Sequence, residues 1–152
     1  QWGMACGWAH LKSLQCIGGI MVGEFKGSCE CGDVTYTVSG PLRPTIACHC
    51  TQCRKTSGHY WAATQVPNTH LTINKNNGLK WFRSSEWARR GFCSGCGSSL
   101  FWQMDSEDAT SIGSGTFDDL TFEATTVDKH ICVADKGVYY SLNDGLPQFE
   151  KW

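Results

Sequence analysis

Short runs of alternating apolar and polar residues dominate the chain from Gly23 onward, and glycine, asparagine, aspartate and serine interrupt them at short intervals. Residues 33–40 alternate valine and tyrosine with threonine and serine, which predicts a strand with one buried face and one solvated face. The same reasoning predicts strands at 59–66, 71–74, 79–85, 88–93, 99–104 and 110–117. Helical periodicity is weak throughout. The pattern therefore indicates an all-β fold of antiparallel sheets.

Two further segments are informative. The sequence NKNNG at 74–78 lies between two predicted strands, and we expect a hairpin loop there because Asn-Gly tolerates the positive φ of such turns. The tail from Asp128 joins a short apolar strand to a polar end with glycine and proline, so we expect it to wrap across the domain. No internal repeat, low-complexity tract or linker divides the chain. Residues 21–152 are therefore predicted to form a single β domain.

Residues 1–20 do not share this pattern. They contain one lysine and an apolar stretch broken by glycine, histidine and glutamine, which matches neither a signal peptide nor a membrane anchor. Because Met21 stands directly before the predicted domain, we interpret 1–20 as an N-terminal extension, either added for expression or read from an upstream start codon. Cys6 and Cys16 within it are not expected to bind metal. Without a leader, the protein is predicted to be cytoplasmic.

Composition narrows the classes of function. The 152 residues include 13 Lys and Arg against 14 Asp and Glu, a formal net charge of -1. This balance lacks the basic excess typical of proteins that bind nucleic acids. No stretch approaches the roughly 20 apolar residues that span a bilayer. We therefore expect a soluble domain with neither nucleic-acid nor membrane partners.

The ten cysteines are the unusual feature, and seven of them fall into three clusters: Cys29 and Cys31, then Cys48, Cys50 and Cys53, then Cys93 and Cys96. Cys-x-Cys and Cys-x-x-Cys spacings both bring two thiolates onto one ion. The first and last pairs together supply the four sulfurs of a closed, tetrahedral zinc site that would tie an early hairpin to a later one. Free thiols or disulfides are the alternatives. Thiol redox chemistry at the Cys-x-x-Cys pair is disfavoured because no βαβ pattern surrounds it.

The middle cluster is different because it supplies only three ligands. Catalytic zinc sites keep three protein ligands and leave the fourth position to water or substrate, whereas structural sites are closed. The alternatives are that these thiols bind no metal, or that His49 or His59 closes the site. His49 lies between two of the cysteines on a segment expected to be extended, so its ring should point away from their sulfurs and pack behind them.

Zinc bound by three or four thiolates carries a net negative charge, so cationic neighbours are expected. Arg54 and Lys55 directly follow the open cluster, and Arg89 and Arg90 precede the closed one. These four residues are either substrate-binding groups or solvated surface charges. Three thiolates also donate much electron density to the metal, which favours a soft, sulfur-bearing or carbonyl substrate over a hydrolytic one.

Three segments, GSCECGDV at 27–34, CHCTQCRKTSG at 48–58 and FCSGCGSSL at 92–100, resemble the glutathione-dependent formaldehyde-activating enzyme family, which includes centromere protein V-like proteins. The resemblance covers about residues 23–135. It implies an all-β, Mss4-like fold with two zinc ions. It also implies ligand sets: Cys29, Cys31, Cys93 and Cys96 for a structural zinc, and Cys48, Cys50 and Cys53 for a catalytic zinc.

The resemblance further implies an activity, the condensation of formaldehyde with glutathione to S-hydroxymethylglutathione, which in reverse is a carbon–sulfur lyase reaction. Arg54, Lys55, Arg89 and Arg90 would then recruit the carboxylates of glutathione. From Met21 the chain is more compact than the enzymes that gave the family its name, and no motif in it indicates glutathione binding. The alternative is a non-catalytic, zinc-stabilised binding module. The polar, cationic loop at 51–58 around an odd number of ligands favours the enzyme.

Overall fold

The computed structural model describes residues 15–17, 20–120 and 125–152. Within these ranges the chain forms strands β1 (Gln15–Ile17), β2 (Ile20–Val22), β3 (Glu24–Ser28), β4 (Val34–Ser39), β5 (Thr45–Cys48), β6 (Trp61–Pro67), β7 (Leu71–Asn76), β8 (Leu79–Arg83), β9 (Ala88–Cys93), β10 (Ser99–Met104), β11 (Ala109–Gly113) and β12 (Val127–Ile131). One α-helix, α1 (Thr51–Ser57), and short 3-10 turns at Asn68–His70, Ser114–Thr116 and Val133–Asp135 complete the described part.

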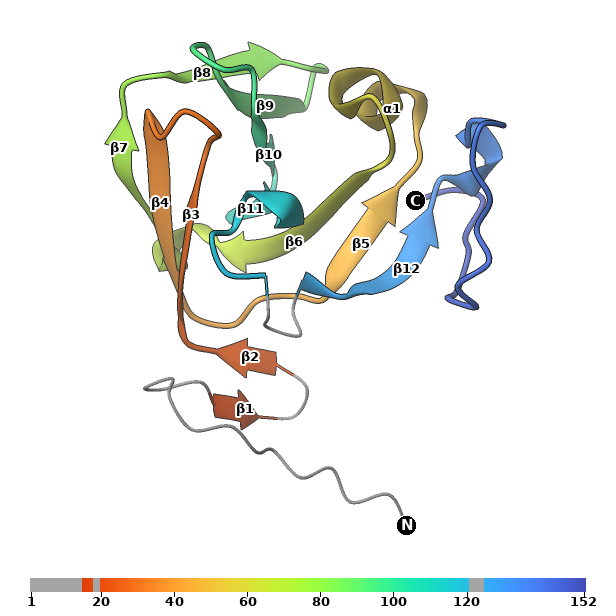
Figure 1. Cartoon of the computed structure of the whole chain (residues 1–152), viewed down its shortest axis with the longest axis horizontal. Helices are drawn as coiled ribbons and strands as arrows, with labels where there is room; N and C mark the ends of the chain where they lie inside the picture. Colours follow the sequence, from red (N-terminus) through yellow and green to blue (C-terminus); the bar gives the residue numbers. More distant parts are fainter. Residues whose placement is uncertain (1–14, 18–19, 121–124) are drawn as a thin grey trace.

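The strands form three sheets (Figure 1). Seven strands make the main sheet in the order β12-β5-β6-β11-β10-β9-β8, and β3, β4 and β7 make a second sheet in the order β3-β4-β7. The third sheet is the pair β1-β2, which lies apart from the other two in Figure 1. All neighbouring strands are antiparallel except β12 and β5, which are parallel. The predicted class of antiparallel β sheets is therefore correct apart from this pair.

The core lies between the two larger sheets. On β4 every second residue is buried, as the alternation of 33–40 predicts, and Tyr36 is fully buried. Its ring packs edge-to-face against Phe101 of β10 at 5.3 Å and against Phe117 at 5.6 Å, a geometry that aromatic quadrupoles favour. The Tyr36 hydroxyl lies 2.7 Å from the Thr116 hydroxyl, so its buried oxygen has a partner. This packing holds β4 of the second sheet against β10 of the main sheet.

The expected hairpin at 74–78 is wrong. A turn is present there, but β7 pairs with β4 and β8 pairs with β9, so the turn carries the chain from one sheet to the other. Asn77 and Gly78 do not have the positive φ of a two-residue hairpin loop. Each strand instead pairs antiparallel with a strand of its own sheet, and pairing with these partners outweighs the local turn preference.

Because helical periodicity is weak, the sequence did not predict α1, which contains Cys53. This helix has seven residues and buries only Cys53, so it is too short to show an apolar stripe. Among the described helices, none is long and apolar enough to cross a membrane. The tail after β12 wraps back as predicted: the Phe149 N–H donates to the His130 carbonyl at 2.9 Å, and the Trp152 ring reaches Trp102 at 6.2 Å.

Deleting residues 1–20 is expected to change the free energy of unfolding by less than about 0.5 kcal/mol, the usual scale for changes away from a core or site. The reason is that β1 and β2 pair only with each other. The domain boundary before Met21 stays a prediction. The expectation that Cys6 and Cys16 do not bind metal also stays a prediction, and Cys6 lies outside the described residues. Thermal melting and elemental analysis of the truncated chain test both points. Loss of bound zinc on truncation would show that Cys6 or Cys16 binds metal.

Candidate metal centres and cavity

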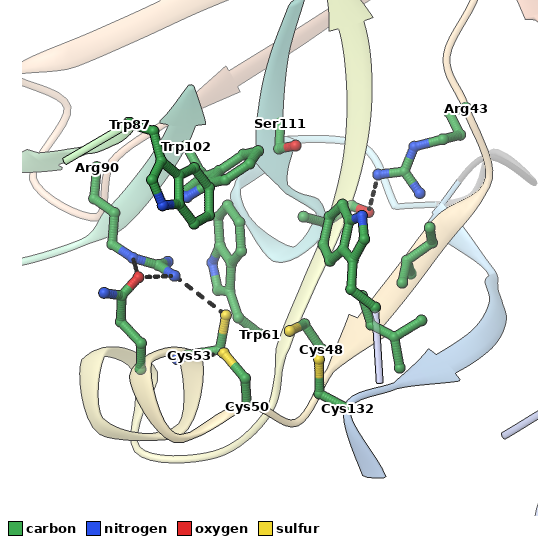
Figure 2. A pocket seen from close by; sticks show the side chains of 15 residues that line it. Arg43, Cys48, Cys50, Cys53, Trp61, Trp87, Arg90, Trp102, Ser111 and Cys132 are labelled. Carbon is green, nitrogen blue, oxygen red and sulfur yellow. Dashed lines mark hydrogen bonds between the residues drawn. The ribbon is translucent and has the colours of Figure 1, made fainter. Parts of the chain in front are cut away.

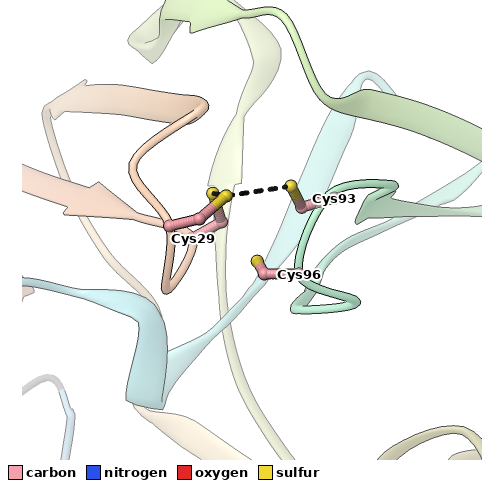
Figure 3. Close-up of side chains that lie close together, drawn as sticks. Cys29, Cys93 and Cys96 are labelled. Carbon is pink, nitrogen blue, oxygen red and sulfur yellow. Dashed lines mark hydrogen bonds between the residues drawn. The ribbon is translucent and has the colours of Figure 1, made fainter.

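The first candidate centre joins two turns that are distant in sequence (Figure 3). The sulfurs of Cys29, Cys31, Cys93 and Cys96 all lie within 4.8 Å of one another. Cys29 and Cys31 lie in the turn between β3 and β4, and Cys93 ends β9. Because the two turns belong to different sheets, an ion held here would link them.

A left-handed glycine completes each of these turns. Gly32 has φ +76°, and its N–H donates to the Cys29 carbonyl at 3.1 Å. Gly97 has φ +80°, and its N–H donates to the Cys93 carbonyl at 2.8 Å. Glycine reaches this conformation without the steric cost that other residues carry. The two turns therefore curl the chain tightly enough to bring two sulfurs of each pair together.

The sulfur spacing fits a tetrahedral ion. Zinc–sulfur bonds of about 2.3 Å in a tetrahedron place sulfurs about 3.8 Å apart. The sulfurs of Cys29 and Cys31 are 3.6 Å apart, and those of Cys31 and Cys93 are 3.7 Å apart. These distances are far longer than a disulfide bond of about 2.05 Å. Hydrogen bonds from the side chain and backbone of Ser98 lower the pKa of Cys96 to about 6, which favours the thiolate that binds metal.

The second candidate centre is formed by Cys48, Cys50 and Cys53, whose sulfurs also lie within 4.8 Å of one another. Cys48 ends β5, Cys50 caps the N-terminus of α1, and Cys53 lies in its first turn. The Cys53 N–H donates to the Cys50 sulfur at 3.4 Å. The change from strand to helix over six residues turns all three side chains toward one point.

Charge in this centre is concentrated on one sulfur. Hydrogen bonds from Cys48 and Cys53 lower the pKa of Cys50 to about 2, whereas hydrogen bonds with Cys50 and Cys53 raise the pKa of Cys48. The reason is that neighbouring thiolates repel one another, so without a cation only one of the three sulfurs ionises readily. A divalent cation removes that restriction because it lets all three sulfurs ionise. The donor set therefore fits a thiophilic ion such as zinc.

Arg90 lies beside this centre (Figure 2). Its Nη2 donates to the Cys53 sulfur at 3.3 Å, and its Nε and Nη2 donate to the Gln52 side-chain oxygen at 3.1 and 2.9 Å. The side chain is only 6% exposed, and its Nη1 is buried without a hydrogen-bond partner. A buried guanidinium with one unused donor group provides a binding point for an acceptor or anion.

The other cations proposed from sequence lie elsewhere. Arg89 is exposed; its guanidinium stacks over the Trp81 ring at 4.3 Å and donates to Gln103. Lys55 is exposed on α1, and Arg54, in the same helix, has a buried Nε without a partner. Of the four candidates, only Arg90 lines the cavity described below. Roles for the other three in substrate binding stay predictions.

The histidines do not complete the second centre. His49 is fully buried, and both its ring nitrogens are engaged: Nδ1 lies 2.5 Å from the Tyr140 hydroxyl and Nε2 lies 2.9 Å from His130 Nδ1. His130 Nε2 in turn lies 2.8 Å from the Asp144 carboxylate. Hydrogen bonding to His130 keeps the pKa of Asp144 low, so His130 Nε2 carries the proton. Neither His49 nitrogen is left for a metal, as predicted.

This chain of hydrogen bonds sets the proton positions on His49. With one proton on the His130 ring, at Nε2 beside Asp144, His49 Nε2 donates to His130 Nδ1 and His49 Nδ1 accepts from the Tyr140 hydroxyl. Burial lowers the pKa of His49 to about 4, which agrees with a neutral ring. The network joins the segment between Cys48 and Cys50 to the C-terminal tail. His59 stacks on Tyr60 and Tyr140 and lies outside both cysteine groups.

A cavity of about 260 Å³ opens onto the second centre. All three cysteines contribute to its wall, and Figure 2 shows Arg90 on one side of it and Arg43 on the opposite side. Trp61 and Trp102 line it between these two arginines. The three sulfurs therefore face a space large enough for a small molecule.

The sequence did not point to the rest of this cavity. Arg43, the tryptophans and Cys132 line it, and they come from separate strands and loops. Cys132 lies beside Cys48 in Figure 2 but outside the group of three sulfurs that could share one ion. It is the only described residue other than glycine with positive φ, at 56°. No local sequence pattern predicts this strained backbone conformation at the end of β12.

Comparison with known proteins agrees with this arrangement. A sequence profile of glutathione-dependent formaldehyde-activating enzymes matches residues 24–135. An uncharacterized lyase of Schizosaccharomyces pombe is 25% identical over 130 residues, which cover 83% of this chain and 90% of that protein. The crystal structure of a Rhodobacter sphaeroides protein has the same fold at a TM-score of 0.53 and 19% identity, covering 82% of this chain and 98% of that chain.

Both candidate centres and the cavity lie within the matched segment, apart from the C-terminal residues that close over the cavity. The sequence resemblance to this family is confirmed, and a lyase-type function at family level follows from it. On this match and on the cysteine groups it contains, the chain belongs to the glutathione-dependent formaldehyde-activating enzyme family.

Proposed function

We propose that the protein is a zinc-dependent carbon–sulfur lyase that cleaves a thiol–aldehyde adduct such as S-hydroxymethylglutathione, or forms it in reverse. The observation that carries the proposal is the meeting of three cysteine sulfurs at the wall of a cavity, with no fourth His, Cys, Asp or Glu ligand atom in the group among the described residues. The four-sulfur cluster supports a second, structural zinc in an Mss4-like fold. The eight cysteines outside the N-terminal segment are free thiols, which supports a reducing, cytoplasmic location.

The reaction needs no oxidant. In cleavage the carbon–sulfur bond of RS–CH₂–OH breaks, the hydroxyl loses its proton, the sulfur gains one, and formaldehyde leaves with its new carbonyl bond. A zinc ion held by Cys48, Cys50 and Cys53 would supply Lewis acidity toward sulfur or oxygen. A guanidinium has hydrogen-bond donors and no acceptor, so Arg90 can donate hydrogen bonds but cannot take the proton. It would orient the oxygen of the adduct and offset the charge of the thiolates.

Measuring formaldehyde release from S-hydroxymethyl thiols tests the proposal. Cys50→Ser is expected to lower kcat/KM at least a hundredfold, because it removes one of the three thiolates that would hold the zinc. The exposed neighbour Thr51 provides the matched control, and Thr51→Ala should change kcat/KM less than about twofold. Wild-type protein with two zinc ions per chain and no release from any adduct would favour the binding module instead.

A further inference from the structure

The walls of the cavity are mainly aromatic. Trp61 lies next to the cysteines, and Trp102 packs against Trp87 at 6.1 Å and against Trp152 at 6.2 Å. Trp61 and Trp102 are at most 9% exposed, whereas Trp87 and Trp152 are 55% and 80% exposed and lie at the mouth. Surfaces of this kind gain binding free energy from covering apolar or aromatic groups.

The largest polar side chains of the cavity already make hydrogen bonds within the protein. The Gln52 amide donates to the Ser84 carbonyl and accepts from Arg90, so both of its ends are used. Arg43 donates to the carbonyls of Pro44 and Ala63. Arg90 Nη1 has no partner. None of the described residues that line the cavity is an aspartate or a glutamate.

Glutathione makes demands that this lining does not meet. The tripeptide carries two carboxylates, an ammonium group and two amides, and a site that buries them must pair each one. The ammonium would have no carboxylate partner in the cavity. The volume of about 260 Å³ is also below the roughly 300–1,000 Å³ typical of sites for drug-sized ligands.

We propose that the thiol of the natural adduct carries a small apolar or aromatic group, which lies between Trp61 and Trp102, and that Arg90 Nη1 donates to the oxygen of the adduct. This inference rests on the proposed function. It assigns the unpartnered Nη1 of Arg90 to the oxygen of RS–CH₂–OH, and the tryptophans to the group R. A thiol of this kind brings no further charge into the cavity, so no charged group of the ligand has to be buried without a partner.

Calorimetric binding of two thiols to the zinc-loaded protein tests the inference without turnover. Benzyl mercaptan is expected to bind ten- to a hundredfold more tightly than glutathione, the range expected for covering one aromatic ring. The same ratio is expected in kcat/KM for formaldehyde release from the two S-hydroxymethyl adducts. Equal or tighter binding of glutathione would overturn the inference, and release from its adduct would at the same time support the proposed lyase activity.

Two tryptophan variants separate the cavity from general hydrophobic binding. Trp87→Ala, at the mouth, should weaken the binding of benzyl mercaptan at least threefold more than the binding of glutathione. Trp81→Ala is the control, because Trp81 is a partly exposed tryptophan of β8 outside the cavity. If both variants lose the preference equally, the tryptophans do not select the substrate. Tight benzyl mercaptan binding without release from either adduct would support the cavity assignment and contradict the lyase.

Discussion

Cys93→Ser is expected to prevent stable folding of the whole domain. Cys93 is fully buried, and its sulfur lies 3.7 Å from that of Cys31, which is 62 residues earlier in the chain. Structural zinc contributes folding free energy directly, on the order of 10 kcal/mol in small zinc modules. That amount is comparable with the roughly 5–15 kcal/mol stability of a typical domain. Losing one of the four ligands should therefore remove most of the stability that the protein has.

The measurement is the melting temperature by circular dichroism, with zinc content determined in parallel. Ser94→Ala is the matched control: it changes the next residue of the same turn, which is exposed, and removes only a hydrogen bond to the Gly78 carbonyl. We expect this control to melt within a few degrees of the wild type and to keep its zinc. Soluble Cys93→Ser protein with an unchanged melting temperature would reject a structural metal at this cluster.

The sequence alone predicted the features of the molecule that depend on residues close together in the chain. Alternation along 33–40 predicted the buried face of β4, and the two spacings predicted which cysteines lie close together. It also predicted that His49 would pack behind the cysteines, because adjacent residues of an extended segment face opposite ways. These features depend on a few neighbouring residues, so the pattern of residue types is enough to predict them.

The features that were missed depend on contacts between distant segments. The segment 74–78 has the composition of a hairpin, yet its flanking strands pair with β4 and β9, which no local signal reveals. The cavity combines Trp61, Trp102 and Trp152, which are far apart in sequence. Arg89 and Arg90 look equivalent as a pair of charges. Alternation on β9 buries the second beside Cys53 and exposes the first on Trp81.

The two metals should also differ in how readily they leave. A mild chelator is expected to remove about one zinc per chain while the protein stays folded. The reason is that Cys48, Cys50 and Cys53 close only a short local loop, whereas the four-sulfur cluster links two turns in different sheets. Loss of the ion from the three-cysteine centre should therefore release only a short part of the chain. Zinc release into a colorimetric indicator, followed together with circular dichroism, measures both events.

Cys50→Ser should reproduce this state without a chelator, with about one zinc per chain and a melting temperature within a few degrees of the wild type. Serine keeps a side-chain oxygen at the N-cap of α1, so the helix retains its capping hydrogen bond while the centre loses a thiolate. In the wild type, added benzyl mercaptan should slow release of the labile zinc, because a thiol in the open position adds a fourth sulfur. A closed site would show no such effect. If both metals leave together with unfolding and thiol changes neither, the three-cysteine centre is structural, and the binding module becomes the better account of this chain.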